Sequence, residues 1–309
     1  NDQRVLRPQL LQDGDEIKIG THVFGWIQGK LIKQTSGQNY RVDVRDLVLP
    51  GRISGSSLSI EPGQLVAFVG GSGAGKSSLL TTIVGQNMDY RGNILINGHE
   101  LRDCYPAIKQ EIGFVPQDDI VHSDLTVEEV LRYSARLKLP DPEQQRAGVE
   151  RVLNELEMQK RRHARVKELS GGQRKRVSIG VELIADPRIL FLDEPTSGLD
   201  PGLDKRMMQL LRRLADSGKT VALVTHATNN VMLCDQVVFL GRGGHLCYAG
   251  HPAQCGSHFG VQGDFADLYQ YLEKSDEEIR QLADHFKTMQ RQQLPQASAV
   301  AELLKPITW

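Results

Sequence analysis

The sequence has 309 residues, enough for one large domain with smaller segments attached to it. Its 37 lysines and arginines nearly balance 38 aspartates and glutamates, which argues against a general nucleic-acid-binding surface and against a long acidic tail. Four cysteines are too few for a disulfide framework and favour a reducing compartment. No apolar run is long enough to span a bilayer and no signal peptide is apparent, and we expect the chain to be a piece of a longer protein.

Residues 1–40 are predicted to form a short β-rich segment. Asp13–Asp15 has the composition of a turn, and Ile17 and Ile19 alternate with polar neighbours as in a half-buried strand. The stretch LQDGDEIKIGTHVF resembles the last strands of a forkhead-associated (FHA) phosphothreonine-binding domain. An antiparallel leader that pairs with the main sheet is an equally good alternative.

A glycine-rich loop follows the apolar run Leu65–Val69 and precedes a predicted helix from Lys76 to Val84. It fits the spacing G-x-x-x-x-G-K-[ST] of a phosphate-binding loop. Glycines let successive backbone N–H groups turn toward a polyphosphate, and the helix N-terminus adds partial positive charge. Lys76 is expected to reach the β and γ phosphates, and the hydroxyl of Ser77 to bind Mg²⁺. The nucleotide-binding residues predicted here are Gly70, Gly71, Ser72, Gly73, Ala74, Gly75, Lys76, Ser77 and Ser78.

Residues 41–261 are predicted to form one α/β core around this loop. Short, continuous runs rich in β-branched residues are typical of strands buried on both faces of a parallel sheet. Their alternation with helical patterns favours an α/β architecture. Strands are expected at Val42–Leu49, Leu58–Ile60, Leu65–Val69, Ile112–Phe114, Ile189–Leu192, Val221–Val224 and Val237–Leu240.

Residues 118–168 of this core are expected to form a helical subdomain. Thr126 and Glu129 make a capping box at the start of one helix. Asp141 and Pro142 pair an N-cap with a proline at the first helical position, which predicts the start of a second helix.

Residues 262–309 have a different pattern. Ser275 and Glu278 form a capping box before a helix with apolar residues on one face. The stretch Gln292–Val300 contains Pro295 and small polar residues, and its composition predicts a linker.

Two adjacent carboxylates, Asp193 and Glu194, end the buried run Ile189–Leu192. Side chains alternate along a strand, so the two must point in different directions, and one can serve Mg²⁺ while the other serves an attacking water. Such a pair alone is more often a solvated turn, but here it belongs to an ordered series of motifs. The other motifs are Gln117 in V-P-Q-D, Ser170–Gln173 in L-S-G-G-Q, Ser197–Asp200 in S-G-L-D, and His226.

In this order the motifs resemble the ATPase domain of ATP-binding cassette (ABC) transporters over most of the chain. The run LSGGQRKRVSIGVELIADPRILFLDEPTSGLDP is similar to the ABCG-type branch and to bacterial exporters that carry FHA domains ahead of the cassette. The resemblance implies a P-loop NTPase fold over residues 41–261, with a parallel-sheet core, an antiparallel β part and a helical subdomain. It also implies that residues 262–309 lead to a transmembrane domain in the same full-length polypeptide.

The resemblance implies a chemical role for each polar motif. Glu194 would act as the general base on the attacking water, and His226 would contact the γ phosphate and stabilise its developing charge. Gln117 completes the implied catalytic set, although this assignment rests more on the resemblance than on its own chemistry. Mg²⁺ would be held by Ser77, Gln117 and Asp193, whose oxygen atoms suit a hard cation.

The signature motif implies a partner. Ser170, Gly171, Gly172 and Gln173 stand at a helix N-terminus, which is an anion-binding position. In this family these residues contact the ATP held by the opposite subunit, so the resemblance implies a composite site in a head-to-tail dimer. The implied ligands are ATP and Mg²⁺, the implied partner is a second copy, no nucleic acid is expected, and the implied place is the cytoplasmic face of the cell membrane.

Three functional classes remain to be compared. The first is the ATPase motor of a membrane exporter. The second is a soluble ABC ATPase with a regulatory or non-transport role, although the chain lacks both the coiled-coil insertion of DNA-repair types and the second cassette of translation types. The third is a non-enzymatic module with a degenerate ATPase, against which Glu194 and His226 argue.

One departure from the family pattern concerns the nucleobase. The family usually stacks adenine on an aromatic residue just before the strand that leads to the phosphate loop, and Leu49–Ile53 contains none. Tyr40 is the nearest upstream aromatic residue but comes early, and Arg52 is an alternative stacking group. Base selectivity is therefore the weakest part of the predicted site.

Two further clusters are expected to be structural. The cysteines and histidines between residues 245 and 258 lack paired-ligand spacing, so we expect ordinary loop residues rather than a zinc site. The basic run Arg174–Arg176 is expected to be a solvated helix face that reinforces phosphate or carboxylate contacts. The first cluster comprises His245, Cys247, His251, Cys255 and His258.

Overall fold

The computed structural model describes residues 16–19, 22–27, 30–34, 40–226, 228–261 and 275–293. The chain divides into two units, Asn1–Asn39 and Tyr40–Trp309. In the first unit the strands β1 (Glu16–Ile19), β2 (His22–Ile27) and β3 (Lys30–Gln34) form an antiparallel sheet of their own rather than joining the sheets of the second unit. The expected turn at residues 13–15 lies outside the described residues, and the FHA resemblance stays a prediction.

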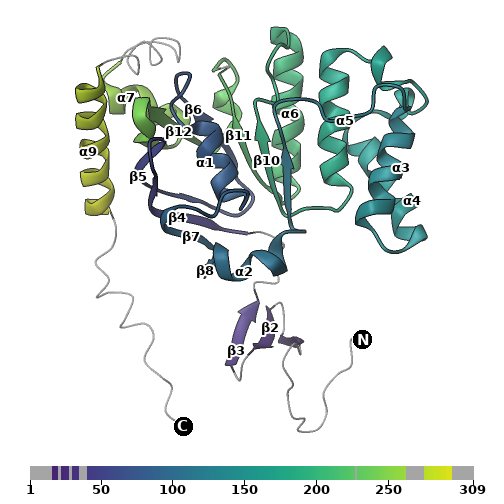
Figure 1. Cartoon of the computed structure of the whole chain (residues 1–309), viewed down its shortest axis with the longest axis horizontal. Helices are drawn as coiled ribbons and strands as arrows, with labels where there is room; N and C mark the ends of the chain where they lie inside the picture. The colour runs from purple at the N-terminus through teal and green to yellow at the C-terminus, as the bar shows by residue number, and fades with distance from the viewer. Residues whose placement is uncertain are drawn as a thin grey trace. The chain divides into compact units, whose positions relative to one another are not determined.

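A six-stranded sheet forms the centre of the second unit, with the order β13-β12-β6-β11-β10-β9 (Figure 1). Five strands are parallel, and β13 pairs antiparallel with β12 at one edge. Every residue of β6, β10 and β11 is buried, as expected for parallel strands covered on both faces. The predicted α/β architecture is confirmed. The strands are β6 (Leu65–Val69), β9 (Ile112–Val115), β10 (Ile189–Asp193), β11 (Thr220–Val224), β12 (Gln236–Gly241) and β13 (His245–Gly250).

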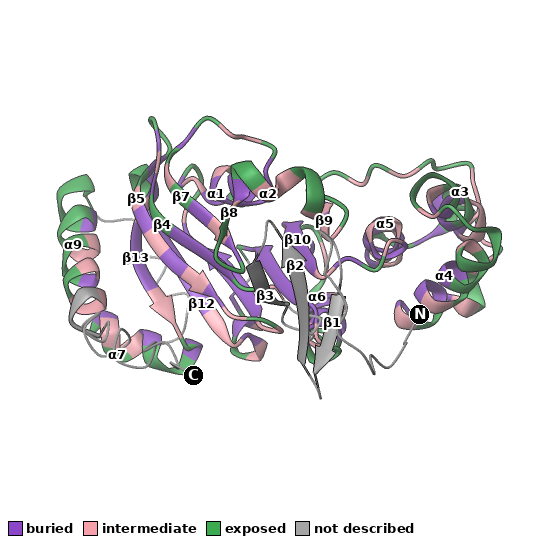
Figure 2. Cartoon of the chain, turned by 90° about the horizontal axis from the view of Figure 1, so that it is seen from below, coloured by how far each residue is buried: buried purple, intermediate pink, exposed green. Residues whose placement is uncertain are grey.

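A second, antiparallel sheet has the strand order β5-β4-β7-β8. Its inner positions are aliphatic and buried, and they belong to the same core as the central sheet (Figure 2). The strand β5 is longer than the sequence predicted. Its first half was missed because it contains Gly55 and serines in place of an apolar alternation. The strands are β4 (Val42–Leu49), β5 (Ile53–Ile60), β7 (Arg91–Ile96) and β8 (His99–Glu100).

Helices connect and cover these strands. The helix α1 (Lys76–Ile83) follows β6, and α6 (Pro201–Asp216) packs against β11. The short helix α2 (Leu101–Ile108) packs against β7. The helix α5 (Gly171–Leu183) contacts β9 and brings the second half of the chain back to the sheet. These helices leave the loops after β6, β9 and β10 together, at the carboxyl ends of the parallel strands.

The helical subdomain consists mainly of α3 (Val127–Lys138) and α4 (Pro142–Glu155), which pack against α5 (Figure 1). Both helices begin where the sequence predicts. The Thr126 hydroxyl accepts from Glu129 N at 3.2 Å, and Asp141 Oδ2 accepts from Gln144 N at 2.9 Å. Two 3₁₀ turns, Gln159–Arg161 and Val166–Glu168, return the chain to α5.

The cysteine and histidine cluster corrects one expectation, because four of its five residues lie in a strand or a helix rather than in a loop. His245 and Cys247 lie in β13, while Cys255 and His258 lie in the helix α7 (Cys255–Phe259). Two buried thiols, those of Cys247 and Cys255, and an aromatic cluster around Tyr248 fill the space between these elements. Three 3₁₀ turns complete this region: Val231–Leu233, Arg242–Gly244 and Pro252–Gln254.

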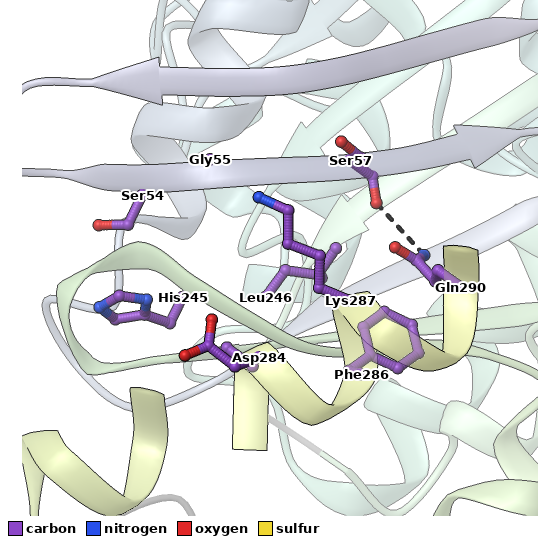
Figure 3. A pocket seen from close by; sticks show the side chains of 10 residues that line it. Ser54, Gly55, Ser57, His245, Leu246, Asp284, Phe286, Lys287 and Gln290 are labelled. Atoms are coloured by element: carbon purple, nitrogen blue, oxygen red, sulfur yellow. Dashed lines mark hydrogen bonds between the residues drawn. The ribbon is translucent and has the colours of Figure 1, made fainter. Parts of the chain in front are cut away.

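The helix α9 (Asp276–Gln293) packs against β13 through Ile279 and Phe286. Between α9, β5 and β13 lies a pocket of about 110 Å³ (Figure 3). Lys287 and Gln290 point across it toward β5, and Gln290 Nε2 donates to Ser57 O at 3.4 Å. These contacts fix the helix to the antiparallel sheet. Among the described residues, no helix is both long and apolar enough to span a membrane.

Candidate functional site

The glycine-rich loop joins β6 to α1 and surrounds a buried lysine. Gly75 has φ 86°, and a Cβ atom there would lie 2.5 Å from Arg52 O, so both the backbone conformation and the space require glycine. Lys76 is 5% exposed, and its Nζ donates to Gly70 O and Gly71 O at 2.9 Å each. Burial lowers the pKa of Lys76, and the charges of Glu194 and Asp193 oppose that shift. The backbone of the loop therefore surrounds the ammonium group of Lys76 and binds it through two carbonyl oxygens.

A pocket of about 270 Å³ opens over this loop. Besides loop residues, it is lined by Arg52 from the turn between β4 and β5, Glu194 from the end of β10, and His226 beyond the end of β11. Such a concave surface of glycine backbone, hydroxyls and cations suits a polyphosphate. The structure thus brings the predicted loop together with two of the three predicted catalytic residues.

Asp193 reaches the loop because of the sheet register. It is paired with Val224, which is paired in turn with Phe68, so the ends of β10, β11 and β6 are level. Ser77 Oγ donates to Asp193 Oδ1 at 2.9 Å. Burial raises the pKa of Asp193, the Ser77 hydrogen bond lowers it, and the neighbouring Glu194 charge raises it further. The two oxygen atoms are of the kind that Mg²⁺ prefers, and they lie beside the pocket, so the residues present fit that ion.

Glu194 sits in an uncommon backbone conformation. Its φ is 48°, in the left-handed region that glycine and asparagine adopt most readily. The amide of Glu194 donates to Val224 O at 3.0 Å, and Ser197 N donates to Glu194 O at 3.1 Å, which holds the residue in place. The backbone turn separates the direction of this carboxylate from that of Asp193. Strained residues of this kind are concentrated at functional sites.

The Glu194 carboxylate is held from both sides by the other predicted catalytic residues. His226 Nε2 lies 2.9 Å from Glu194 Oε1, and Gln117 Nε2 donates to Glu194 Oε2 at 3.3 Å. Gln117 follows β9 and His226 follows β11, so loops after three neighbouring strands meet at one carboxylate. This arrangement can orient a general base next to the phosphate loop.

The signature residues occupy the N-terminus of α5. Ser170 is the N-cap, its hydroxyl accepts from Gln173 N at 3.4 Å, and its own amide donates to Gln173 Oε1 at 3.2 Å. Among the described residues that line the phosphate pocket, none belongs to residues 170–173. In Figure 1, α5 lies with α3 and α4, on the other side of β10 from α1. The two predicted anion-binding helix ends therefore stand apart within one chain.

Comparison with known proteins decides the family. A family model described as ABC transporter matches residues 53–197. The chain contains an ABC transporter ATPase domain. Over 272 residues it is 42% identical to an ABC transporter ATP-binding/permease protein of Mycobacterium tuberculosis, covering 84% of this chain and 31% of that protein. Over 216 residues it is 40% identical to ABC transporter G family member 28 of Arabidopsis thaliana, covering 66% of this chain and 19% of that protein.

Solved structures agree with this assignment. The ABC ATPase domain matches cbiO1 of Clostridium perfringens, described as part of the ABC transporter complex cbiONQ, with a TM-score of 0.65 and 28% identity. That match covers 71% of this chain and 91% of cbiO1. A further match is an ATP-binding subunit of an ABC transporter, with a TM-score of 0.63 and 26% identity over 75% of this chain and 99% of that one. ABC ATPase domains hydrolyse ATP, and the chain spans less than a third of the two curated relatives named above.

Two candidates for the nucleobase contact lie in very different places in this ABC ATPase domain. The Tyr40 carbonyl accepts from Thr220 Oγ1 at 2.9 Å. Thr220 is the first residue of β11, so Tyr40 lies at the amino ends of the parallel strands, opposite the phosphate-binding loop. Arg52 instead lines the phosphate pocket, and its guanidinium donates to Ser78 Oγ at 3.0 Å. Arg52 is thus the residue placed to contact a nucleotide, and Tyr40 is not.

One residue near the ABC site was placed wrongly by sequence reasoning. Lys175 does not belong to a solvated helix face, because it is only 6% exposed and its Nζ donates to Gln117 O at 2.7 Å. Gly172 and Ile179, which are three residues before it and four after it, are also buried. This helical spacing is the signal in the sequence that would have placed Lys175 on the inner face of α5.

Proposed function

We propose that the chain is the ATP-hydrolysing motor of an ABCG-like membrane exporter, acting at the cytoplasmic face of the cell membrane. The observation that carries this proposal is the position of Glu194 between His226 and Gln117, beside the loop that buries Lys76. The printed names of the relatives, an ATP-binding/permease protein and a G family transporter, support the transport role.

In the proposed reaction, Glu194 accepts a proton from a water molecule that attacks the γ phosphorus of ATP. The bond between that phosphorus and the bridging oxygen breaks, and ADP leaves with the electron pair. Lys76 and His226 stabilise the negative charge on the phosphate oxygens. Ser77, Asp193 and Gln117 would hold Mg²⁺, which when bound neutralises phosphate charge.

We infer further that the working unit is a head-to-tail homodimer. The loop at α1 and the signature at α5 each present a helix N-terminus, and the phosphate pocket includes no signature residue among its described lining. A triphosphate held by the loop of one chain could also contact Ser170 of a second copy. It would then be bound by the N-terminus of α1 from one chain and that of α5 from the other. The transmembrane domain is proposed to belong to the same full-length polypeptide.

The alternative is a soluble ABC ATPase without a transport role. No contact in the described part of the chain supports this alternative. The name of the mycobacterial relative, an ATP-binding/permease protein, supports the exporter. Determining the gene sequence beyond the codon for Trp309 separates the two, because an exporter requires several apolar spans of about 20 residues there. A reading frame without such spans on either side would support the alternative.

We expect Lys76→Ala to weaken ATP binding by about tenfold or more, because it removes a charge-assisted donor to the phosphates. Titration with a fluorescent ATP analogue measures the dissociation constant. Lys109→Ala, at the exposed end of α2, is the control and should bind like the wild type. Unchanged affinity in a folded Lys76→Ala variant would mean that the loop does not hold the phosphates.

We also expect modest base selectivity, with ATP and GTP hydrolysed at rates within about tenfold of each other. The reason is that Leu49–Ile53 offers no aromatic ring, Tyr40 lies at the amino ends of the parallel strands, away from the phosphate-binding loop, and phosphate contacts do not distinguish bases. Parallel turnover measurements with the two nucleotides test this. A strong preference for ATP that disappears in Arg52→Ala would show instead that the Arg52 guanidinium recognises adenine.

A further inference from the structure

A buried ammonium group joins the signature helix to the loop that carries Gln117. The side chain of Lys175 is 7% exposed, and its Nζ donates to Gln117 O at 2.7 Å and Pro116 O at 3.4 Å and lies 3.1 Å from Asp119 Oδ1. A buried lysine is costly unless its three N–H groups are matched by acceptors. Here two carbonyl acceptors and a neighbouring carboxylate come from one short loop, so the lysine binds that loop as a unit.

Among the described residues, no other hydrogen bond or ion pair joins this loop to α5. Residues 116–120 lie outside helices and strands, between β9 and α3. A cavity of about 470 Å³ lies beside both the loop and α5, and its lining includes Pro116, Ile120 and Val181. Ile120 itself is 77% exposed. The position of the loop relative to α5 therefore depends strongly on the contacts of Lys175.

Gln117 is held at both ends by different parts of the domain. Its backbone carbonyl is bound by Lys175 from α5, while its side-chain amide donates to Glu194 Oε2 at the end of β10. A displacement of the carbonyl also displaces the Cα atom from which the side-chain amide extends, so the backbone position limits where that amide can reach. Ser170, the N-cap of α5, precedes Lys175 by little more than one helical turn. The same helix thus connects the signature to Gln117.

We propose that Lys175 is a positioning residue: it sets Gln117 beside Glu194 and links that contact to the place of the signature helix. This inference rests on the proposed ATPase function. In the proposed dimer, ATP at Ser170 of a chain would fix α5, and Lys175 would carry that position to Gln117 of the same chain. Lys175 touches no reacting atom and acts through Gln117.

The test begins with Lys175→Met, which keeps the length of the side chain and removes its donors. We expect turnover to fall about tenfold and the Mg²⁺ concentration for half-maximal turnover to rise several-fold, while the dissociation constant for ATP stays within about twofold. Lys138→Met is the matched control, because Lys138 Nζ also binds α5 through a carbonyl and a carboxylate, Val181 O and Glu182 Oε2, both at 3.0 Å. Its turnover and Mg²⁺ dependence should match those of the wild type.

Thermal melting of both variants separates loss of fold from loss of position. Should Lys175→Met melt below the assay temperature, Lys175→Gln, which is shorter and uncharged but keeps a polar end, is measured in its place, and the same changes are expected at smaller magnitude. A double-mutant cycle with Gln117→Ala completes the test. If Lys175 acts through Gln117, adding Lys175→Met to Gln117→Ala should slow turnover no further.

Two outcomes would overturn the inference and leave the proposed function standing: a Lys175→Met variant that behaves like Lys138→Met, or effects of Lys175→Met and Gln117→Ala that multiply. A wild-type chain that does not hydrolyse ATP with Mg²⁺ would overturn the proposed function and this inference together. The wild-type measurement therefore distinguishes the two failures.

Discussion

Glu194→Gln is expected to lower ATP turnover by about 10²–10⁴-fold while ATP binding persists. The substitution keeps the shape of the side chain and its contacts with His226 and Gln117, but it removes the proton acceptor. Release of inorganic phosphate measures turnover, and a fluorescent ATP analogue measures binding. Glu111→Gln is the control, because Glu111 lies at the amino end of β9, away from the site, and is paired with Arg188.

Turnover within a few-fold of the wild type in Glu194→Gln would contradict the assignment of the general base. Loss of both turnover and binding would instead indicate that the carboxylate organises the phosphate pocket. Near-wild-type values in Glu111→Gln show that removal of one carboxylate charge elsewhere has no such effect.

Two inactive variants are expected to restore part of each other's activity when mixed. Lys76→Ala damages the phosphate loop, and Ser170→Arg replaces the N-cap hydroxyl of α5 with a large cation. In a mixed dimer one composite site carries both defects, and the other combines an intact loop with an intact signature. The rate should also rise more steeply than linearly with protein concentration, because two chains must associate.

A site complete within one chain gives a different pattern. No rescue, rates strictly proportional to concentration, and a monomeric Glu194→Gln variant at saturating ATP would together defeat the dimer proposal. Absence of rescue by itself is not sufficient, since two sites that must fire together also give none. Sedimentation of Glu194→Gln with and without ATP provides the independent measurement of assembly.

Much of the core was predictable because its signals are local. The run Leu65–Val69 is continuous and apolar, and the structure places it as a fully buried strand. The capping box at Thr126 forms as the sequence indicates. The helix α6 is not among the predicted elements, although Asp200 and Pro201 give the same N-cap and proline signal as Asp141 and Pro142, so its start was also predictable.

The site was predictable in its parts but not in its contacts. The phosphate loop, the two carboxylates and His226 are recognisable from spacing and order. The pairing of Ser77 with Asp193 depends on the register of three strands, which short apolar runs do not specify. The contact between Lys175 and Gln117 joins residues 58 positions apart, so no local pattern reveals it.

The backbone of Glu194 has a consequence for protein engineering. Its φ of 48° is a conformation that costs a β-carbon-bearing residue about 1–2 kcal/mol and glycine almost nothing. A stabilisation effort guided by backbone energetics alone would therefore select this position early and replace the glutamate. At Glu194 the local backbone energy therefore opposes the proposed function, and a more thermostable glycine variant there would have lost the proposed proton acceptor.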